Sequence, residues 1–166
     1  MADQKLSELG LPPGGILPDD VLYVVRLFDS APDEFYQALV SDLKTPEVWM
    51  FALSDEDTGI IEKIAAITVR APFAATLTGL RASVSTASIS GPITLDVNIG
   101  IGSGPASILS TKLTIDQDEL TSLDGAVPVV IADPNIDDDA SITVDIDTAG
   151  AGAVGLKITF LVTATS

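Results

Sequence analysis

Alternation of apolar and polar residues in the C-terminal part of this chain is the feature that most constrains its fold. It is unbroken over residues 93–99 and 140–147, and over 156–163 it is interrupted only by Leu161. A period of two places successive side chains on opposite faces of a β-strand, so that one face is buried and the other is solvated. Several such strands separated by Gly, Pro and Asp turns are typical of an antiparallel sandwich or barrel.

Residues 60–166 are therefore expected to form an antiparallel β-sandwich. The expected strands lie near 63–70, 75–86, 93–101, 106–115, 127–131, 140–147 and 155–164. Their spacing predicts two packed sheets with a Greek-key or jelly-roll arrangement.

The preceding residues indicate a small α+β unit. Apolar strands are expected at 21–25 and 34–39. A short helix is expected either from Ser41 to Lys44 or, opened by Pro46, through Phe51.

The polar, acidic stretch 54–59, which ends in Gly, predicts a linker. The expected domains are accordingly 1–59 and 60–166. The fold class is mainly β, with a small α+β N-terminal unit followed by the sandwich.

The net charge disfavours two kinds of partner. The chain has 24 acidic and 8 basic residues and no His, which gives a formal charge of −16. A negative field of this kind disfavours nucleic acid and anionic membranes, both of which require Lys and Arg. The N-terminus lacks the layout of a signal peptide and no apolar run is long enough to span a bilayer, so we expect a soluble protein made in a cytoplasm.

The densest group of oxygen ligands is a possible calcium site formed by Asp133, Asn135, Asp137 and Asp139. Their spacing by two resembles the first half of a calcium loop, but the Gly and Glu of an EF-hand are missing and a strand follows. A looser calcium site at a strand corner is one interpretation, and a solvated acidic turn is the other. No further cofactor is expected.

The only aromatic-rich cluster is Trp49, Met50 and Phe51. Trp and Met are favoured in interface hot spots, so one interpretation is a docking anchor. The other is that the cluster fills the core of the N-terminal unit.

No enzyme motif is present. Without His there is no Ser-His-Asp arrangement, and without Cys there is no thiolate nucleophile. Acidic pairs such as Asp145 and Asp147 occupy outward positions, and residues 60–166 contain few aromatics for a sugar cleft. We expect a protein that is not an enzyme.

Several segments resemble tailed-bacteriophage proteins. Those similar to the start of phage appendage proteins are 2–9, 17–25 and 39–44. Those similar to a β-sandwich module of phage structural proteins are 77–87, 107–116, 131–133, 137–147 and 155–158, which together cover most of 65–162.

This resemblance implies a non-enzymatic virion protein, displayed on the capsid as a decoration protein or head fibre. A tail-fibre or baseplate component involved in host attachment is the alternative within the same class. It implies a homotrimer docked by its N-terminal unit on other virion proteins, such as the major capsid, portal-neck or tail proteins. A glycan-binding module that contacts the host surface is the alternative from a different class.

Overall fold

Antiparallel strands make up most of the chain that the computed structural model describes, which is residues 21–24, 36–39, 46–101 and 104–165. The chain divides into two compact units, Met1–Lys44 and Thr45–Ser166. In the first unit, β1 (Val21–Val24) pairs antiparallel with β2 (Tyr36–Leu39), which confirms both strands expected there. The helix expected from Ser41 to Lys44 lies outside the described residues.

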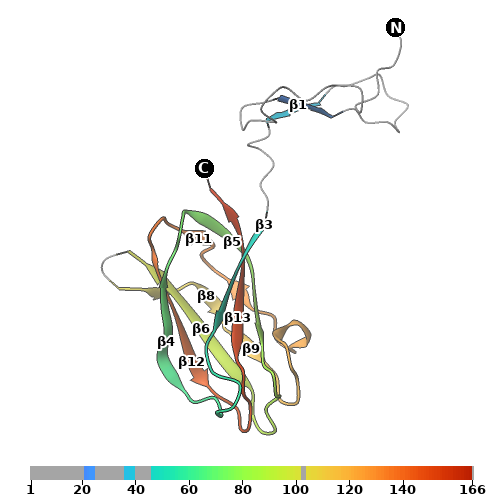
Figure 1. Ribbon diagram of the computed structural model, residues 1–166, viewed down its shortest axis with the longest axis vertical. Helices are drawn as coiled ribbons and strands as arrows, with labels where there is room; N and C mark the ends of the chain where they lie inside the picture. Colours follow the sequence, from blue (N-terminus) through green and yellow to red (C-terminus); the bar gives the residue numbers. More distant parts are fainter. Residues whose placement is uncertain (1–20, 25–35, 40–45, 102–103, 166) are drawn as a thin grey trace, which may run out of the picture. The chain divides into compact units, whose positions relative to one another are not determined.

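The second unit is built from two antiparallel sheets (Figure 1). The strands of the first sheet are β3 (Pro46–Ala52), β5 (Ala75–Ser83), β11 (Asn135–Ile136) and β13 (Lys157–Ala164). The strands of the second sheet are β4 (Lys63–Arg70), β6 (Ile93–Gly100), β7 (Ala106–Ser107), β9 (Leu113–Ile115) and β12 (Ser141–Thr148). A smaller pair joins β8 (Leu109–Thr111) to β10 (Val130–Ile131).

The order in which these strands pair defines a jelly roll. In the first sheet the order is β11–β5–β13–β3, and in the second it is β4–β12–β6–β7, with β9 also pairing with β6. The first strand of the unit, β3, therefore pairs with the last, β13, while β4 pairs with β12 and β5 with β11. One long antiparallel hairpin wound into two facing sheets gives this nested pairing, which is the jelly-roll arrangement.

Alternating side chains from both sheets fill a single core. Phe160 and Leu95, one from each sheet, are both fully buried. Phe51 packs edge-to-face on Phe160 with ring centroids 5.7 Å apart, and Trp49 packs in the same way on Phe73 at 5.3 Å. Edge-to-face pairs at this spacing add to the stabilisation that comes from burial alone.

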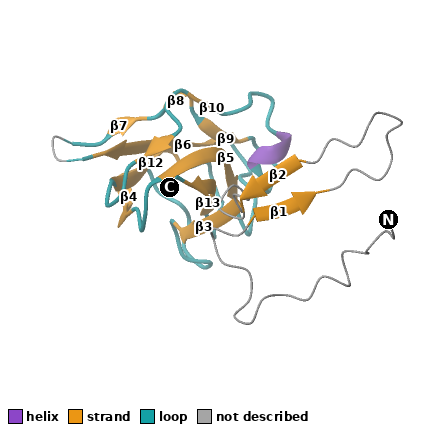
Figure 2. Cartoon of the chain, turned by 90° about the horizontal axis from the view of Figure 1, so that it is seen from above, coloured by secondary structure: helices purple, strands orange, loops and turns teal. Residues whose placement is uncertain are grey.

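Most of the described strands agree with the alternation, and three departures are local. The strand expected at 106–115 is divided into β7, β8 and β9, and the one at 127–131 is reduced to β10. The short strand β11 was not expected. Figure 2 shows that strands and loops form the described chain apart from one 3-10 turn, η3 (Ser122–Asp124).

Strand β3 corrects two expectations. The helix from Pro46 through Phe51 is wrong, because these residues form a strand that pairs along its whole length with β13. The domain boundary at residue 59 is also wrong, because β3 belongs to the first sheet of the jelly roll. The compact units divide between Lys44 and Thr45.

The segment 54–59 is likewise not a linker but the loop that joins β3 to β4. Its backbone is tied to the β12–β13 connection, since the Gly155 amide donates to the Asp55 carbonyl at 2.8 Å. Within the loop, Asp55 Oδ1 accepts from the amides of Asp57 and Thr58. These two amide donors lower the pKa of Asp55 below its ordinary value, the Thr58 amide more than the Asp57 amide.

Candidate functional surfaces

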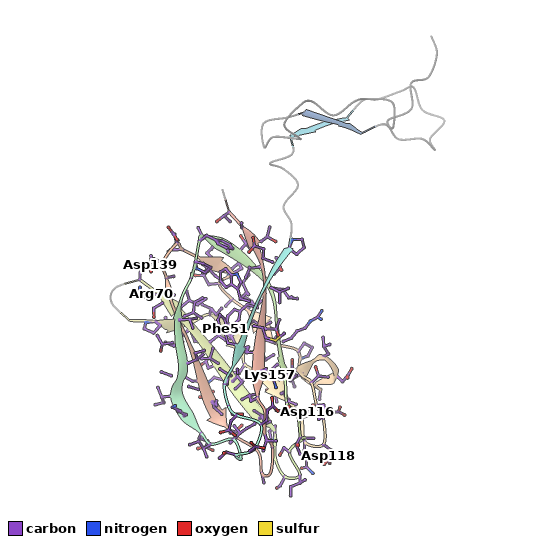
Figure 3. All side chains as sticks on the ribbon, in the orientation of Figure 1. Phe51, Arg70, Asp116, Asp118, Asp139 and Lys157 are labelled. Carbon is purple, nitrogen blue, oxygen red and sulfur yellow. The ribbon has the colours of Figure 1, made fainter. Side chains whose placement is uncertain are left out.

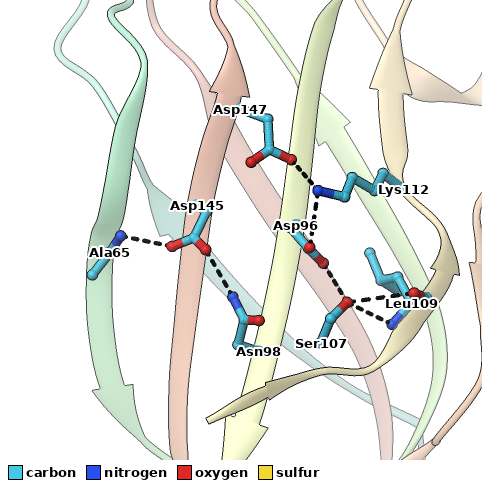
Figure 4. Close-up of polar contacts among 8 residues, drawn as sticks. All are labelled: Ala65, Asp96, Asn98, Ser107, Leu109, Lys112, Asp145 and Asp147. Carbon is cyan, nitrogen blue, oxygen red and sulfur yellow. Dashed lines mark hydrogen bonds and ion pairs between the residues drawn. The ribbon is translucent and has the colours of Figure 1, made fainter. Parts of the chain in front are cut away.

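The outer face of the second sheet carries two neighbouring groups of interacting polar side chains, one around Asp145 and one around Asp96 (Figure 4). Asp96 on β6 and Asp145 on β12 are direct cross-strand neighbours, an arrangement that destabilises a sheet unless the two charges are compensated. Asn98 Nδ2 donates to Asp145 Oδ2 at 3.0 Å. Lys112 Nζ lies 3.1 Å from Asp96 Oδ2 and 2.7 Å from Asp147 Oδ2, so it compensates the charge of both carboxylates.

Asp96 is buried although it lies on the outward side of β6. Its residue is only 8% exposed, because Lys112 and Ser107 cover it. Ser107 Oγ donates to Asp96 Oδ1 at 2.6 Å. A buried carboxylate needs such donors to offset the loss of hydration.

Ser107 and Lys112 do not fit the serine nucleophile and lysine base of a Ser-Lys catalytic pair. A lysine that activates a serine must lose its proton near neutral pH. Here hydrogen bonds to Asp147 and, second, to Asp96 raise the pKa of Lys112 above its ordinary value of 10.5. The Ser107 hydroxyl also gives its hydrogen bond to a carboxylate and not to the amine.

Asp145 has a second role at an irregularity of the neighbouring strand. The pairing of β12 with β4 shifts register between Val144 and Ile146, and Ala65 there has a left-handed φ of 50°. The Ala65 amide donates to Asp145 Oδ1 at 2.7 Å. The carboxylate thus provides an acceptor where the strand ladder is interrupted.

The residues of the possible calcium site are held by other contacts. Asp133 Oδ1 accepts from both the amide and the side-chain nitrogen of Asn135, at 3.0 Å each. Asp139 pairs with Arg70 across 3.6 Å, and the two residues lie close together in Figure 3. Among the residues that the structure describes, no three acidic side chains lie close enough together to hold a metal ion. Asp137 therefore belongs to no such group.

The Trp49 cluster is split between the two sides of β3. Trp49 and Phe51 are half-buried and pack against the core of the jelly roll. Met50 and its neighbour Val48 point to the other side and are 63% and 57% exposed. The aromatic rings therefore fill a core, though not that of the N-terminal unit, while Met50 remains available to a partner.

The outer face of the first sheet differs sharply in charge from that of the second. The four strands of this sheet contain one acidic residue, Glu47, which alternates to the same side of β3 as Trp49. Strand register places the outward residues side by side, with Val48 opposite Leu161 and Met50 opposite Thr159. We call this surface the carboxylate-free face, and it consists of Val48, Met50, Ala52, Thr76, Thr78, Gly79, Arg81, Ser83, Asn135, Lys157, Thr159, Leu161 and Thr163.

A shallow hollow lies between the β3–β4 loop and the second sheet. Its volume is about 210 Å³, and its lining includes Asp55, Ile60, Lys63 and Ile146. Ligand pockets for small molecules are usually larger than about 300 Å³ and more enclosed. We assign no ligand to it.

The sequence analysis missed the group around Asp96. Asp145 and Asp147 were recognised as sharing one polar face, and Asp96 and Asn98 alternate in the same way on their own strand. The missing information was the pairing of β6 with β12 and the position of Lys112, which follows β8. Lysine at that position carries no local signal for a contact with β12.

Comparison with protein-family models, curated proteins and solved structures finds no match for this chain. Within the described part of the chain, no helix has the length and apolar character required to cross a membrane. The strand pairing and the charge together define the class as an acidic antiparallel β-sandwich with jelly-roll pairing.

Proposed function

We propose that this chain is a non-enzymatic structural protein of a tailed-phage virion, displayed on the capsid as a decoration protein or head fibre. The observation that carries the proposal is that the stretch resembling the phage module, 65–162, coincides with the jelly roll from β4 to β13. Jelly rolls are frequent in viral capsid and lectin domains. Because this fold also serves other functions, its sequence resemblance to phage modules is needed for the proposal.

The surface chemistry supports a scaffold over a catalyst. The carboxylates around Asp96 are occupied by Lys112, Ser107 and Asn98, and the described hollow is shallow. A rigid sandwich with an acidic surface suits a body that is displayed in many copies without binding nucleic acid.

In this proposal the N-terminal unit docks on another virion protein, and three chains associate. A trimer makes the second and third docking contacts intramolecular, which raises avidity without new chemistry. A tail-fibre or baseplate component is the alternative location, and the N-terminal resemblance to appendage proteins favours it.

The glycan-binding alternative has less support. Sugar rings usually stack on exposed aromatic side chains. The aromatic side chains that the structure describes, Trp49, Phe51, Phe73 and Phe160, pack in or against the core. A glycan array probed with the purified chain tests this alternative directly.

Antibody labelling of intact particles, viewed by electron microscopy, tests the proposal. Label over the capsid is expected for a decoration protein or head fibre. Label at the tail would transfer the chain to the attachment apparatus. Unlabelled particles, with the antibody shown to bind the purified chain, would contradict a virion role.

A further inference from the structure

Acidic residues are distributed unevenly between the two outer faces of the jelly roll. Residues 45–166 contain 16 acidic and 5 basic residues, a net charge of −11. Nevertheless, no outward position of β3, β5, β11 or β13 holds a carboxylate. Two of these positions hold cations, Arg81 and Lys157, and Lys157 is paired at the end of the face with Glu56 of the β3–β4 loop. The outer face of the second sheet instead carries Asp145 and Asp147, together with Asp96, which Lys112 and Ser107 cover.

We propose that the carboxylate-free face is the surface through which copies of this chain contact one another. This inference deepens the proposed function, because it assigns a surface to the expected self-association. A basic partner would be attracted to the acidic surfaces of the molecule. An equally acidic body, which is what a second copy is, meets least repulsion where carboxylates are fewest. On this face that is the centre, away from Glu56 at Lys157 and from Asp133 at Asn135.

The composition of the face fits a protein contact. Interfaces are enriched in Met and Arg and depleted in Asp, Glu and Lys. Met50 and Val48 are well exposed at the edge strand, and Leu161 lies beside Val48 in the central strand. Thr78, Thr159 and Thr163 surround them with small polar groups.

The size of the face limits how strong the contact is. The three long strands, β3, β5 and β13, each have at least seven residues, whereas β11 has two. At about 4.8 Å between strands and about 3.4 Å per residue, three strands of seven residues span about 340 Å² in projection. Two such faces bury less than the roughly 1,200 Å² of a typical stable complex. We therefore expect self-association in the micromolar range that is reinforced when several chains are held together.

Sedimentation of the full chain at micromolar concentrations in physiological salt tests this inference. We expect concentration-dependent oligomers in the unaltered chain and at least tenfold weaker association in Met50→Asp and Thr78→Asp. The matched control is Thr68→Asp, which places the same charge at an exposed outward threonine of β4 in the second sheet. Circular dichroism confirms that each variant is folded.

A full chain that stays monomeric at about 100 μM, well above the expected range, overturns the inference. Equal weakening by Thr68→Asp, or unchanged association in both variants on the carboxylate-free face, overturns it as well. These results are separable from the virion proposal. Particles that carry a chain found to be monomeric would refute the contact alone, whereas oligomers of a chain absent from particles would refute the virion role alone.

Discussion

At the scale of single residues, polar side chains of the second sheet compensate for an interrupted strand ladder and for carboxylates that lie close together. Asp145 accepts from the Ala65 amide at the irregularity of β4, and Lys112 separates the charges of Asp96 and Asp147. β4 is an edge strand, and an edge strand with such an irregularity is a poor template for pairing with other chains. The contacts of Asp145 and Lys112 therefore contribute to the stability of the second sheet.

Removing the acceptor at Asp145 has a predictable cost. Asp145→Ala leaves the Ala65 amide without its protein partner, and we expect a loss of about 1 kcal/mol in the free energy of unfolding, because water replaces part of the bond. Asp145→Asn retains an oxygen acceptor and is expected to lose less. Urea unfolding measures both, with Asp137→Ala on an exposed turn as the control; equal losses in all three variants would contradict this role.

The ammonium of Lys112 makes stability depend on pH at the alkaline end. Its pKa is raised in the folded state, so its contribution is fully present below the unfolded value of 10.5 and is lost as the pH rises through the folded pKa. Because the side chain is 46% exposed, we expect no more than about 1 kcal/mol.

We therefore expect the difference in unfolding free energy between the unaltered chain and Lys112→Met to shrink as the pH rises through the folded-state pKa of Lys112. Denaturant unfolding from neutral pH to strongly alkaline pH measures it. A difference that stays constant across the range would mean that the ion pairs contribute nothing measurable.

At the scale of elements, the alternation of apolar and polar residues predicts strands correctly where a strand and the strands that pair with it are regular. Residues 93–99 and 140–147 correspond closely to β6 and β12, because one face of each is buried by the opposite sheet. The helix expected at Pro46–Phe51 failed for a tertiary reason. Only the pairing with β13 decides that this short apolar run is a strand, and nothing within the run indicates that partner.

The position of β3 predicts the outcome of two truncations. A chain of residues 45–166 retains both sheets and is expected to unfold cooperatively with nearly full stability. A chain of residues 60–166 lacks β3, which uncovers the edge of β13 and removes the contact of Phe51 with Phe160.

Loss of these buried contacts is expected to lower the free energy of unfolding by at least about 3 kcal/mol, as for large core deletions. Thermal unfolding followed by circular dichroism compares the two chains. Equal melting temperatures would mean that β3 is not an integral part of the jelly roll.

At the scale of the whole molecule, the two sheets of one sandwich present different surfaces. One outer face is polar and carries three carboxylates, and the other has none. The pattern of alternation indicated which residues point outward, but not which strands share a sheet. The separation of charge between the two faces could therefore be recognised only from the pairing order.

The central claim is that this acidic jelly roll is a structural part of a phage particle. The number of copies in purified particles, measured by mass spectrometry with isotope-labelled peptides against the major capsid protein, tests it most directly. We expect a fixed copy number: one comparable with the number of capsid sites indicates decoration, and a small number indicates a tail or baseplate position. A chain that is made in infected cells but washes away from purified particles would contradict the claim.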